Sequence, residues 1–169
     1  MSLRGFLLRP GNPAIKRWLV IIMINTLISV DRIKIIDSKS KEEAIKELAG
    51  LLGSSENITD CHEIEKGILD REQIMSTAIG LGIAIPHVRH EKVKEMTIAI
   101  GVCKEGIEYH AIDEKPVVLM VMIVSPLHTH REYLKVLAKL VLILKNDELR
   151  NTIINANSPE EIYSALKER

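Results

Sequence analysis

The sequence predicts an α/β domain, in which amphipathic helices alternate with apolar strands along the chain. Ser40–Ala44 has the composition of a helix start, and Val117–Val124 is a continuous apolar run of strand length. Helical spacing of apolar residues then returns from His130 to Leu144. Interleaved signals of this kind are typical of layered α/β folds, and 169 residues fit a single domain.

Two helices are predicted in the first half of the chain. Ser40 and Glu43 form a capping box, in which the serine oxygen accepts a free amide and the glutamate reaches back. Asp60 and Glu63 repeat the pattern and predict a second helix that runs to Asp70 or beyond.

Strand signals follow in the middle of the chain. Ile83–Ile85 is a short apolar run that ends at Pro86, and Thr97–Val102 is a longer one. Gly106–His110 is expected to be a hairpin partner or an edge segment. After Val117–Val124 the pattern is helical, first over His130–Leu144 and then in two further helices at 148–154 and after Ser158.

Composition excludes several classes of function. The 23 basic and 23 acidic residues balance, and aromatic residues are only 3%, so we expect no nucleic-acid surface. Cys61 and Cys103 form no CxxC pair and no zinc pattern, which favours two reduced thiols and a cytoplasmic location.

The first 24 residues are expected to be an extension, with the folded domain spanning 25–169 and beginning near Met23, a candidate start codon. Basic residues and prolines precede an apolar run, Trp18–Ile24, that is shorter than the roughly 20 residues a membrane-spanning helix needs. No small-residue cleavage site follows it. We therefore expect no membrane insertion; an anchor or a partner-binding helix is the alternative.

The sequence around His87 is the one stretch that indicates chemistry. Pro86 fixes its own φ and holds Ile85 extended, so a short strand delivers His87 to a position that is both held and accessible. Gly80 and Gly82 permit a close backbone approach that a Cβ would block.

Three nearby side chains are suited to phosphate. Arg71 and Arg89 offer guanidinium forks and Thr77 a hydroxyl, while a neutral imidazole is a competent nucleophile near pH 7. Glu72 is expected to pair locally with Arg71, with a role as a base as the alternative. Taken alone, His87 is better explained as a structural histidine bonded to a backbone carbonyl than as a nucleophile.

A resemblance decides between these readings. Arg71-Glu72, Ser76-Thr77, Gly80, Gly82 and Ile83 to His87 resemble the enzyme IIA domains of the fructose/mannitol class of the bacterial phosphoenolpyruvate-dependent sugar phosphotransferase system, a class that includes the nitrogen-regulatory IIA proteins. The likeness extends over most of the chain from about residue 25. It implies a mixed β-sheet flanked by helices on both faces, phosphorylation of His87, and a phosphoryl-holding role for Arg71.

One position departs from the family pattern. The family has a second active-site histidine seven residues after a proline, and counting from Pro126 that position is Tyr133. Tyrosine offers a hydroxyl donor but no positive charge near pH 7. His128 or His130 is expected to reach in from the preceding loop as an alternative.

The resemblance also implies partners. A histidine phosphocarrier protein would be the donor, and a IIB component would be the acceptor. The alternatives are a regulatory protein that binds targets according to its phosphorylation state, and a sensor domain that is never phosphorylated. We expect no cofactor, and no metal, because the pairs His87/His90 and His128/His130 lack a carboxylate or thiol at familiar spacing.

Overall fold

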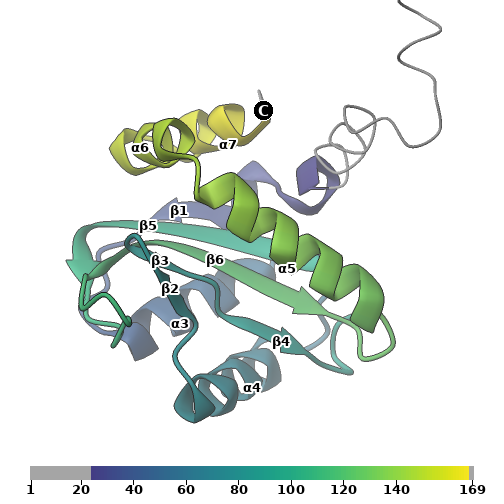
Figure 1. The fold of residues 1–169 in the computed structure, drawn as a ribbon. Coiled ribbons are helices and arrows are strands. Elements are labelled where there is room, and N and C mark those ends of the chain that lie inside the picture. The colour runs from purple at the N-terminus through teal and green to yellow at the C-terminus, as the bar shows by residue number, and fades with distance from the viewer. Residues whose placement is uncertain (1–23, 168–169) are drawn as a thin grey trace, which may run out of the picture.

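The computed structural model describes residues 24–167. The predicted N-terminal extension, residues 1–24, therefore lies outside the described residues except for its last member. The described chain forms one mixed β-sheet with helices on both of its faces (Figure 1), as the sequence and the resemblance predict.

The sheet has six strands. In chain order they are β1 (Ile33–Ile35), β2 (Ala78–Gly80), β3 (Ile83–Ala84), β4 (His87–Arg89), β5 (Thr97–Ile107) and β6 (Val117–Ser125). Their spatial order is β1-β5-β6-β3-β2, and β4 also pairs with β6. The central β5–β6 pair is antiparallel, whereas β3 and β4 both run parallel to β6. β3 and β4 therefore pair one after the other along the same edge of β6, with Ile85 and Pro86 between them.

Two helical layers enclose the sheet. The helices are α3 (Lys41–Leu52), α4 (Cys61–Ile74), α5 (His130–Leu144), α6 (Asp147–Asn155) and α7 (Pro159–Lys167), and a 3-10 turn η1 (Val30–Arg32) precedes β1. α3 and α4 lie on one face, and α5, α6 and α7 lie on the other (Figure 1). Each face buries its own apolar cluster, one with Tyr133 and Leu140 of α5, the other with Leu48 of α3 and Ile68 of α4.

The helix starts follow the predicted caps. The Ser40 hydroxyl accepts from the Glu43 amide at 3.2 Å, and one Asp60 carboxylate oxygen accepts from the amides of His62 and Glu63. Each bond satisfies an amide that has no partner within the helix. The Glu43 carboxylate reaches back to the Lys39 amide rather than to that of Ser40.

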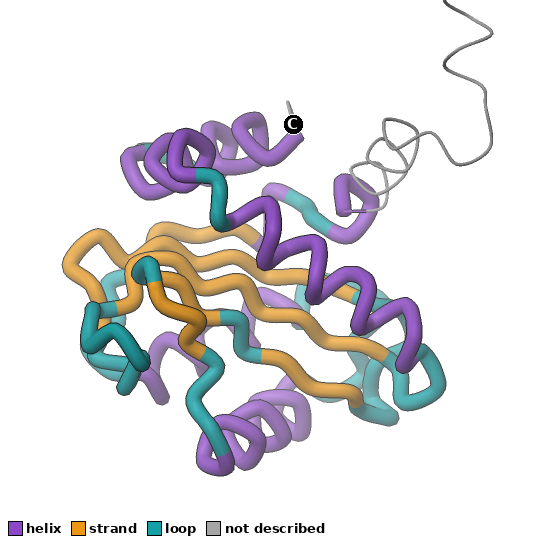
Figure 2. Tube along the Cα trace, in the orientation of Figure 1, coloured by secondary structure: helices purple, strands orange, loops and turns teal. Residues whose placement is uncertain are grey.

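The strands differ from expectation in two places. β5 continues through Gly106 to Ile107, which pairs antiparallel with Val117 of β6, so the expected hairpin partner is the end of β5 and residues 108–110 lie outside the strands. β2 and β4 are additional three-residue strands on either side of β3 (Figure 2), and β4 begins at His87 itself. Within residues 24–167, no helix is both long and apolar enough to cross a bilayer.

Candidate functional site

A pocket of about 210 Å³ opens beside His87. Its walls come from the α4–β2 region, from the β3–β4 connection and from α5. The lining residues are Arg71, Ser76, Thr77, Ile79, Ile85, His87, Leu137 and Val141. The structure therefore brings together three residues that the sequence predicts as functional, namely Arg71, Thr77 and His87.

The imidazole of His87 is held by one ring nitrogen. Nδ1 lies 2.6 Å from the carbonyl oxygen of Ile85. Because a carbonyl only accepts hydrogen bonds, Nδ1 carries the proton in the neutral ring, and Nε2 keeps its lone pair. Nε2 has no hydrogen-bond partner among the described residues. The contact that a purely structural histidine would make therefore leaves the other nitrogen free to react.

The surroundings of His87 favour its neutral form. Partial burial lowers the pKa of His87, and the positive charge of Arg71 lowers it further, while the bond to Ile85 and the charge of Glu72 act in the opposite direction. An unprotonated nucleophile is what attack at phosphorus requires.

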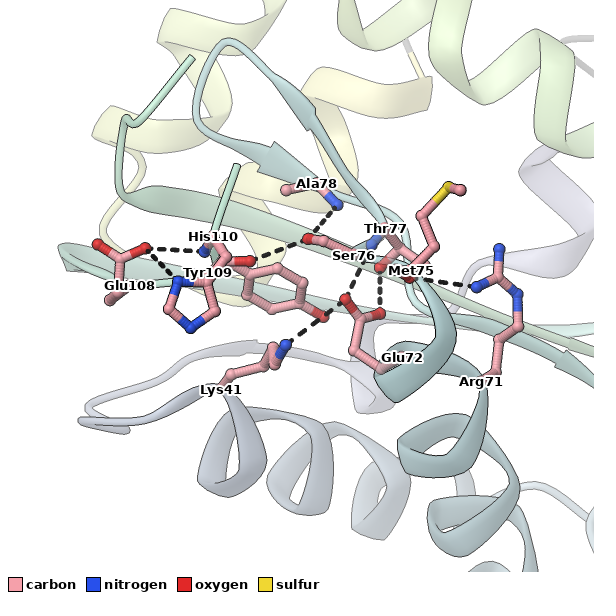
Figure 3. Close-up of polar contacts among 10 residues, drawn as sticks. All are labelled: Lys41, Arg71, Glu72, Met75, Ser76, Thr77, Ala78, Glu108, Tyr109 and His110. Carbon is pink, nitrogen blue, oxygen red and sulfur yellow. Dashed lines mark hydrogen bonds and ion pairs between the residues drawn. The ribbon is translucent and has the colours of Figure 1, made fainter. Parts of the chain in front are cut away.

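Arg71 lies in the last turn of α4 and points its guanidinium at the loop that follows. Its Nη1 donates to the carbonyl oxygen of Met75 at 3.1 Å, and its other N–H groups have no partner among the described residues. The expected Arg71–Glu72 ion pair is therefore wrong, because the two side chains turn to different partners (Figure 3).

Glu72 is buried beneath the pocket wall, with only 4% of its surface exposed. Its two carboxylate oxygens accept from Thr77, one from the backbone amide at 2.8 Å and the other from the hydroxyl at 2.6 Å. The Lys41 ammonium lies 3.8 Å from Oε1. The Thr77 hydroxyl is thus already engaged as a donor, which corrects the expectation that it is free to bind phosphate.

Tyr133 stands next to His87. The centroids of the two rings are 5.8 Å apart and the rings are tilted by 52°. Burial raises the pKa of Tyr133 to about 12, although the charges of Arg71 and Arg89 lower it in part. The residue at the second-histidine position is thus a neutral phenol within reach of the same site.

The other predicted residues lie outside the pocket lining. Gly80 and Gly82 form the β2–β3 turn with φ values of +82° and +71°, so they serve the turn that precedes His87 rather than a ligand. Arg89 follows His87 on β4 and donates to the Leu127 carbonyl at 3.0 Å. His128 and His130 are exposed to solvent and do not reach in.

Exposed apolar side chains adjoin the pocket-lining residues. Ile74 and Met75 lie between Arg71 and Ser76 in the chain and are 80% and 68% exposed. Leu134 and Ile79 are also exposed. We call Ile74, Met75, Ile79 and Leu134 the apolar rim. Near His87 in the chain, Leu81 is exposed, Val88 is partly buried, and Ile83 belongs to the core.

Sequence reasoning missed several members of this site. Ser76, Ile79 and the α5 residues Leu137 and Val141 line the pocket without having been singled out for it. Ser76 stands in the Ser-Thr pair of the central motif, which is the signal that points to it. Among residues 24–167, no group of three or more His, Cys, Asp and Glu side chains converges as metal ligands do.

Comparison with known proteins identifies the family of this chain. The family described as "Phosphoenolpyruvate-dependent sugar phosphotransferase system, EIIA 2" matches residues 26–169. The fructose-specific EIIABC component of Bacillus subtilis is 33% identical over 86% of this chain. The fructose-specific EIIA component of Haloferax volcanii is 31% identical over 76% of it. The chain spans 84% of the Haloferax protein but only 23% of the Bacillus protein.

Solved structures share the fold. The nitrogen regulatory protein IIA-Ntr of Neisseria meningitidis superposes with a TM-score of 0.79 at 30% identity, over 85% of this chain and 99% of that one. The enzyme IIA of mannitol from Escherichia coli, solved with phosphorylated IIB, gives a TM-score of 0.72 over 84% of this chain and 98% of that one. Its identity of 20% shows a common fold alone.

Proposed function

Because this chain belongs to the EIIA 2 family of the phosphoenolpyruvate-dependent sugar phosphotransferase system and is a phosphoryl carrier of that system, we propose that His87 carries the phosphoryl group on Nε2. The observation that supports this most is the bond from Nδ1 to the Ile85 carbonyl, which holds the ring and leaves Nε2 free at the pocket.

The transfer step needs only one bond made and one broken. The Nε2 lone pair attacks phosphorus as the bond from phosphorus to the donor's ring nitrogen breaks, and that nitrogen keeps the electron pair. The proton on His87 Nδ1 stays on that nitrogen, hydrogen-bonded to the Ile85 carbonyl, so no proton has to leave the ring. Onward transfer is the same step with the acceptor as nucleophile.

Arg71 and Tyr133 are placed to assist. The free guanidinium N–H groups of Arg71 would bind equatorial phosphoryl oxygens, where negative charge concentrates during transfer. Tyr133 would donate a hydrogen bond from its hydroxyl to the same group, since its raised pKa keeps it protonated at neutral pH. Thr77 would act indirectly, by shaping the wall.

The partners are inferred from the family. A histidine phosphocarrier protein is the proposed donor and a IIB component the proposed acceptor, docking on the apolar rim. We place the carrier in the cytoplasm, which agrees with the free thiols of Cys61 and Cys103. We also propose that 25–169 form the carrier domain and that 1–24 form an extension, in agreement with the family match from residue 26.

Intact-mass measurement tests the acceptor residue. The protein is incubated with phosphoenolpyruvate, enzyme I and the phosphocarrier protein, and the wild type should gain one acid-labile phosphate. His87→Ala should gain none, whereas His62→Ala, which changes an exposed histidine outside the pocket, should gain it as the wild type does. If the wild type gains no phosphate under conditions that phosphorylate a control IIA domain, the carrier function is excluded and a sensor domain that is never phosphorylated is supported instead.

A regulatory role is the second candidate. The Neisseria IIA-Ntr structure is 30% identical and covers nearly the whole of that protein, and Tyr133 departs from the two-histidine pattern. Adding a purified IIB domain to the phosphorylated chain separates the two functions. Loss of phosphate to IIB supports transport, while retention, together with a neighbouring regulator or ion-transporter gene, supports control.

A further inference from the structure

Glu72 is a buried carboxylate that the transfer step itself does not use. It does not line the pocket, yet it accepts hydrogen bonds from Thr77, which does (Figure 3). Its side chain joins the last turn of α4 to Thr77, just before β2, across the loop that contains Met75 and Ser76. Four of the pocket-lining residues, Arg71, Ser76, Thr77 and Ile79, belong to this segment.

A chain of three hydrogen bonds runs from Glu72 to the reactive ring. The Thr77 amide donates to the Glu72 carboxylate at 2.8 Å, and the Ile85 amide donates to the Thr77 carbonyl at 3.1 Å. The His87 Nδ1–H then donates to the Ile85 carbonyl at 2.6 Å. Each bond fixes the backbone that holds the next, so the position of the imidazole depends on that of the carboxylate.

The carboxylate is itself held from the opposite side. Lys41, the first residue of α3, reaches to 3.8 Å from it and also lies 5.1 Å above the ring of Tyr109. Tyr109 is fully buried, and its pKa is raised by burial and by the negative charge of Glu72. Glu72 therefore sits where α3, α4 and the Thr77 segment meet, satisfying donors that would otherwise be buried without partners.

We propose that Glu72 is a positioning residue for phosphoryl transfer, which acts through Thr77 and Ile85 to hold His87 with Nε2 toward the pocket and which Lys41 anchors. This inference rests on the proposed role of His87. A small displacement of a nucleophile costs much of the rate, so the effect should appear in transfer even where the fold survives.

Glu72→Gln tests the proposal with little change in shape. The amide replaces one carboxylate oxygen with an NH₂ donor, so the Thr77 amide and hydroxyl no longer have one acceptor oxygen each, and the charge that pairs with Lys41 is lost. Glu47→Gln is the matched control, because Glu47 also accepts a serine hydroxyl, from Ser38 at 2.6 Å, and pairs with a lysine, Lys34 at 2.6 Å, away from His87. We expect both variants to be less stable, but only Glu72→Gln to lose phosphoryl transfer, by about tenfold to a hundredfold.

The imidazole resonances supply a readout that general destabilisation does not move. In ¹⁵N spectra of the unphosphorylated protein, His87 should show the Nδ1–H tautomer in the wild type and in Glu47→Gln, and a mixed population in Glu72→Gln. The expected loss of transfer rate is at least tenfold. The proposal would be overturned if Glu72→Gln folds, shows wild-type His87 resonances and transfers phosphate within about twofold of the Glu47→Gln rate.

Two Thr77 variants decide the matter if Glu72→Gln does not fold. Thr77→Val removes the hydroxyl that bonds to Glu72 and keeps the branched shape, and Thr77→Ser keeps the hydroxyl. Thr77→Val should shift the His87 resonances and slow transfer more than Thr77→Ser does; equal effects would overturn the proposal. A wild type that takes up no phosphate, or a His87→Ala that does, means that the proposed acceptor has failed and this inference falls with it.

Discussion

At the scale of single residues, His87 combines a fixed ring with a free nitrogen. The Ile85 carbonyl holds Nδ1–H, and burial together with Arg71 favours the uncharged imidazole. Tyr133 lies against this ring as a neutral donor, so the nearby positive charges come from Arg71 and Arg89. In the proposed site, a phenol therefore stands where the family pattern has a second imidazole, and the guanidinium of Arg71 lines the pocket.

The pKa of His87 should lie below the ordinary value of about 6.5. The unfolded chain then binds the His87 proton more tightly than the folded chain does. Above about pH 6.5 the stability that comes from the neutral His87 is fully present. As the pH falls from about 6.5 toward the lowered pKa, this stability is lost and the free energy of unfolding should decrease. Titration of the His87 ring resonances by NMR, in native and in urea-unfolded protein, measures the shift, and a native pKa equal to or above the unfolded one would contradict it.

At the scale of elements, α4 carries both Arg71, the side chain proposed to bind phosphate, and Glu72, the carboxylate proposed to position His87. Arg71 and Glu72 are neighbours in its last turn, and they point toward different parts of the α4–β2 loop. The helix begins at a well-formed cap, since Asp60 accepts from two backbone amides. The placement of the site therefore depends on a helix whose start is determined by one side chain.

Asp60→Ala should lower the free energy of unfolding by about 1 kcal/mol, because two amides in the first turn of α4 lose their acceptor. Urea denaturation followed by circular dichroism measures the change. Asp70→Ala, an exposed position in the same helix that caps nothing, is the control and should not be destabilised. Equal stability of Asp60→Ala and the wild type would show that the cap contributes nothing.

At the scale of the whole molecule, the site lies where the two helical layers meet at the sheet. α4 covers one face and α5 the other, and both supply pocket-lining residues, as do β2 and β4. Both layers carry exposed apolar side chains near pocket residues in the chain: Ile74 and Met75 lie between Arg71 and Ser76, and Leu134 lies one turn before Leu137. A partner protein that reaches Nε2 would bury these side chains.

Met75→Glu should raise the KM for the phosphorylated donor by roughly tenfold, because a carboxylate at the centre of an apolar interface must lose its hydration. Its stability should not change, since the side chain is 68% exposed. Leu142→Glu, at a 64% exposed position of α5 that does not line the pocket, is the control and should transfer as the wild type does. An unchanged KM in Met75→Glu would exclude this residue from the docking surface.

The sequence by itself determined the features that depend on neighbours in the chain. The capped starts of α3, α4 and α7, the long strand β6 and helix α5 are all confirmed, because periodicity and capping are local properties. β1, β2 and β4 escaped prediction, because three residues are too few to show a strand pattern. The motif around His87 likewise predicts the α/β fold of its family.

Only the tertiary structure decided which side chains meet. Three features join or separate segments far apart in the sequence: the pairing of Glu72 with Lys41 instead of Arg71, the tilted contact of Tyr133 with His87, and the position of His128 and His130 outside the pocket. A periodic pattern shows which face of a helix is buried, but not which other buried face it meets. That choice depends on strand register and on how the two helical layers pack against the sheet, and these are properties of the assembled core.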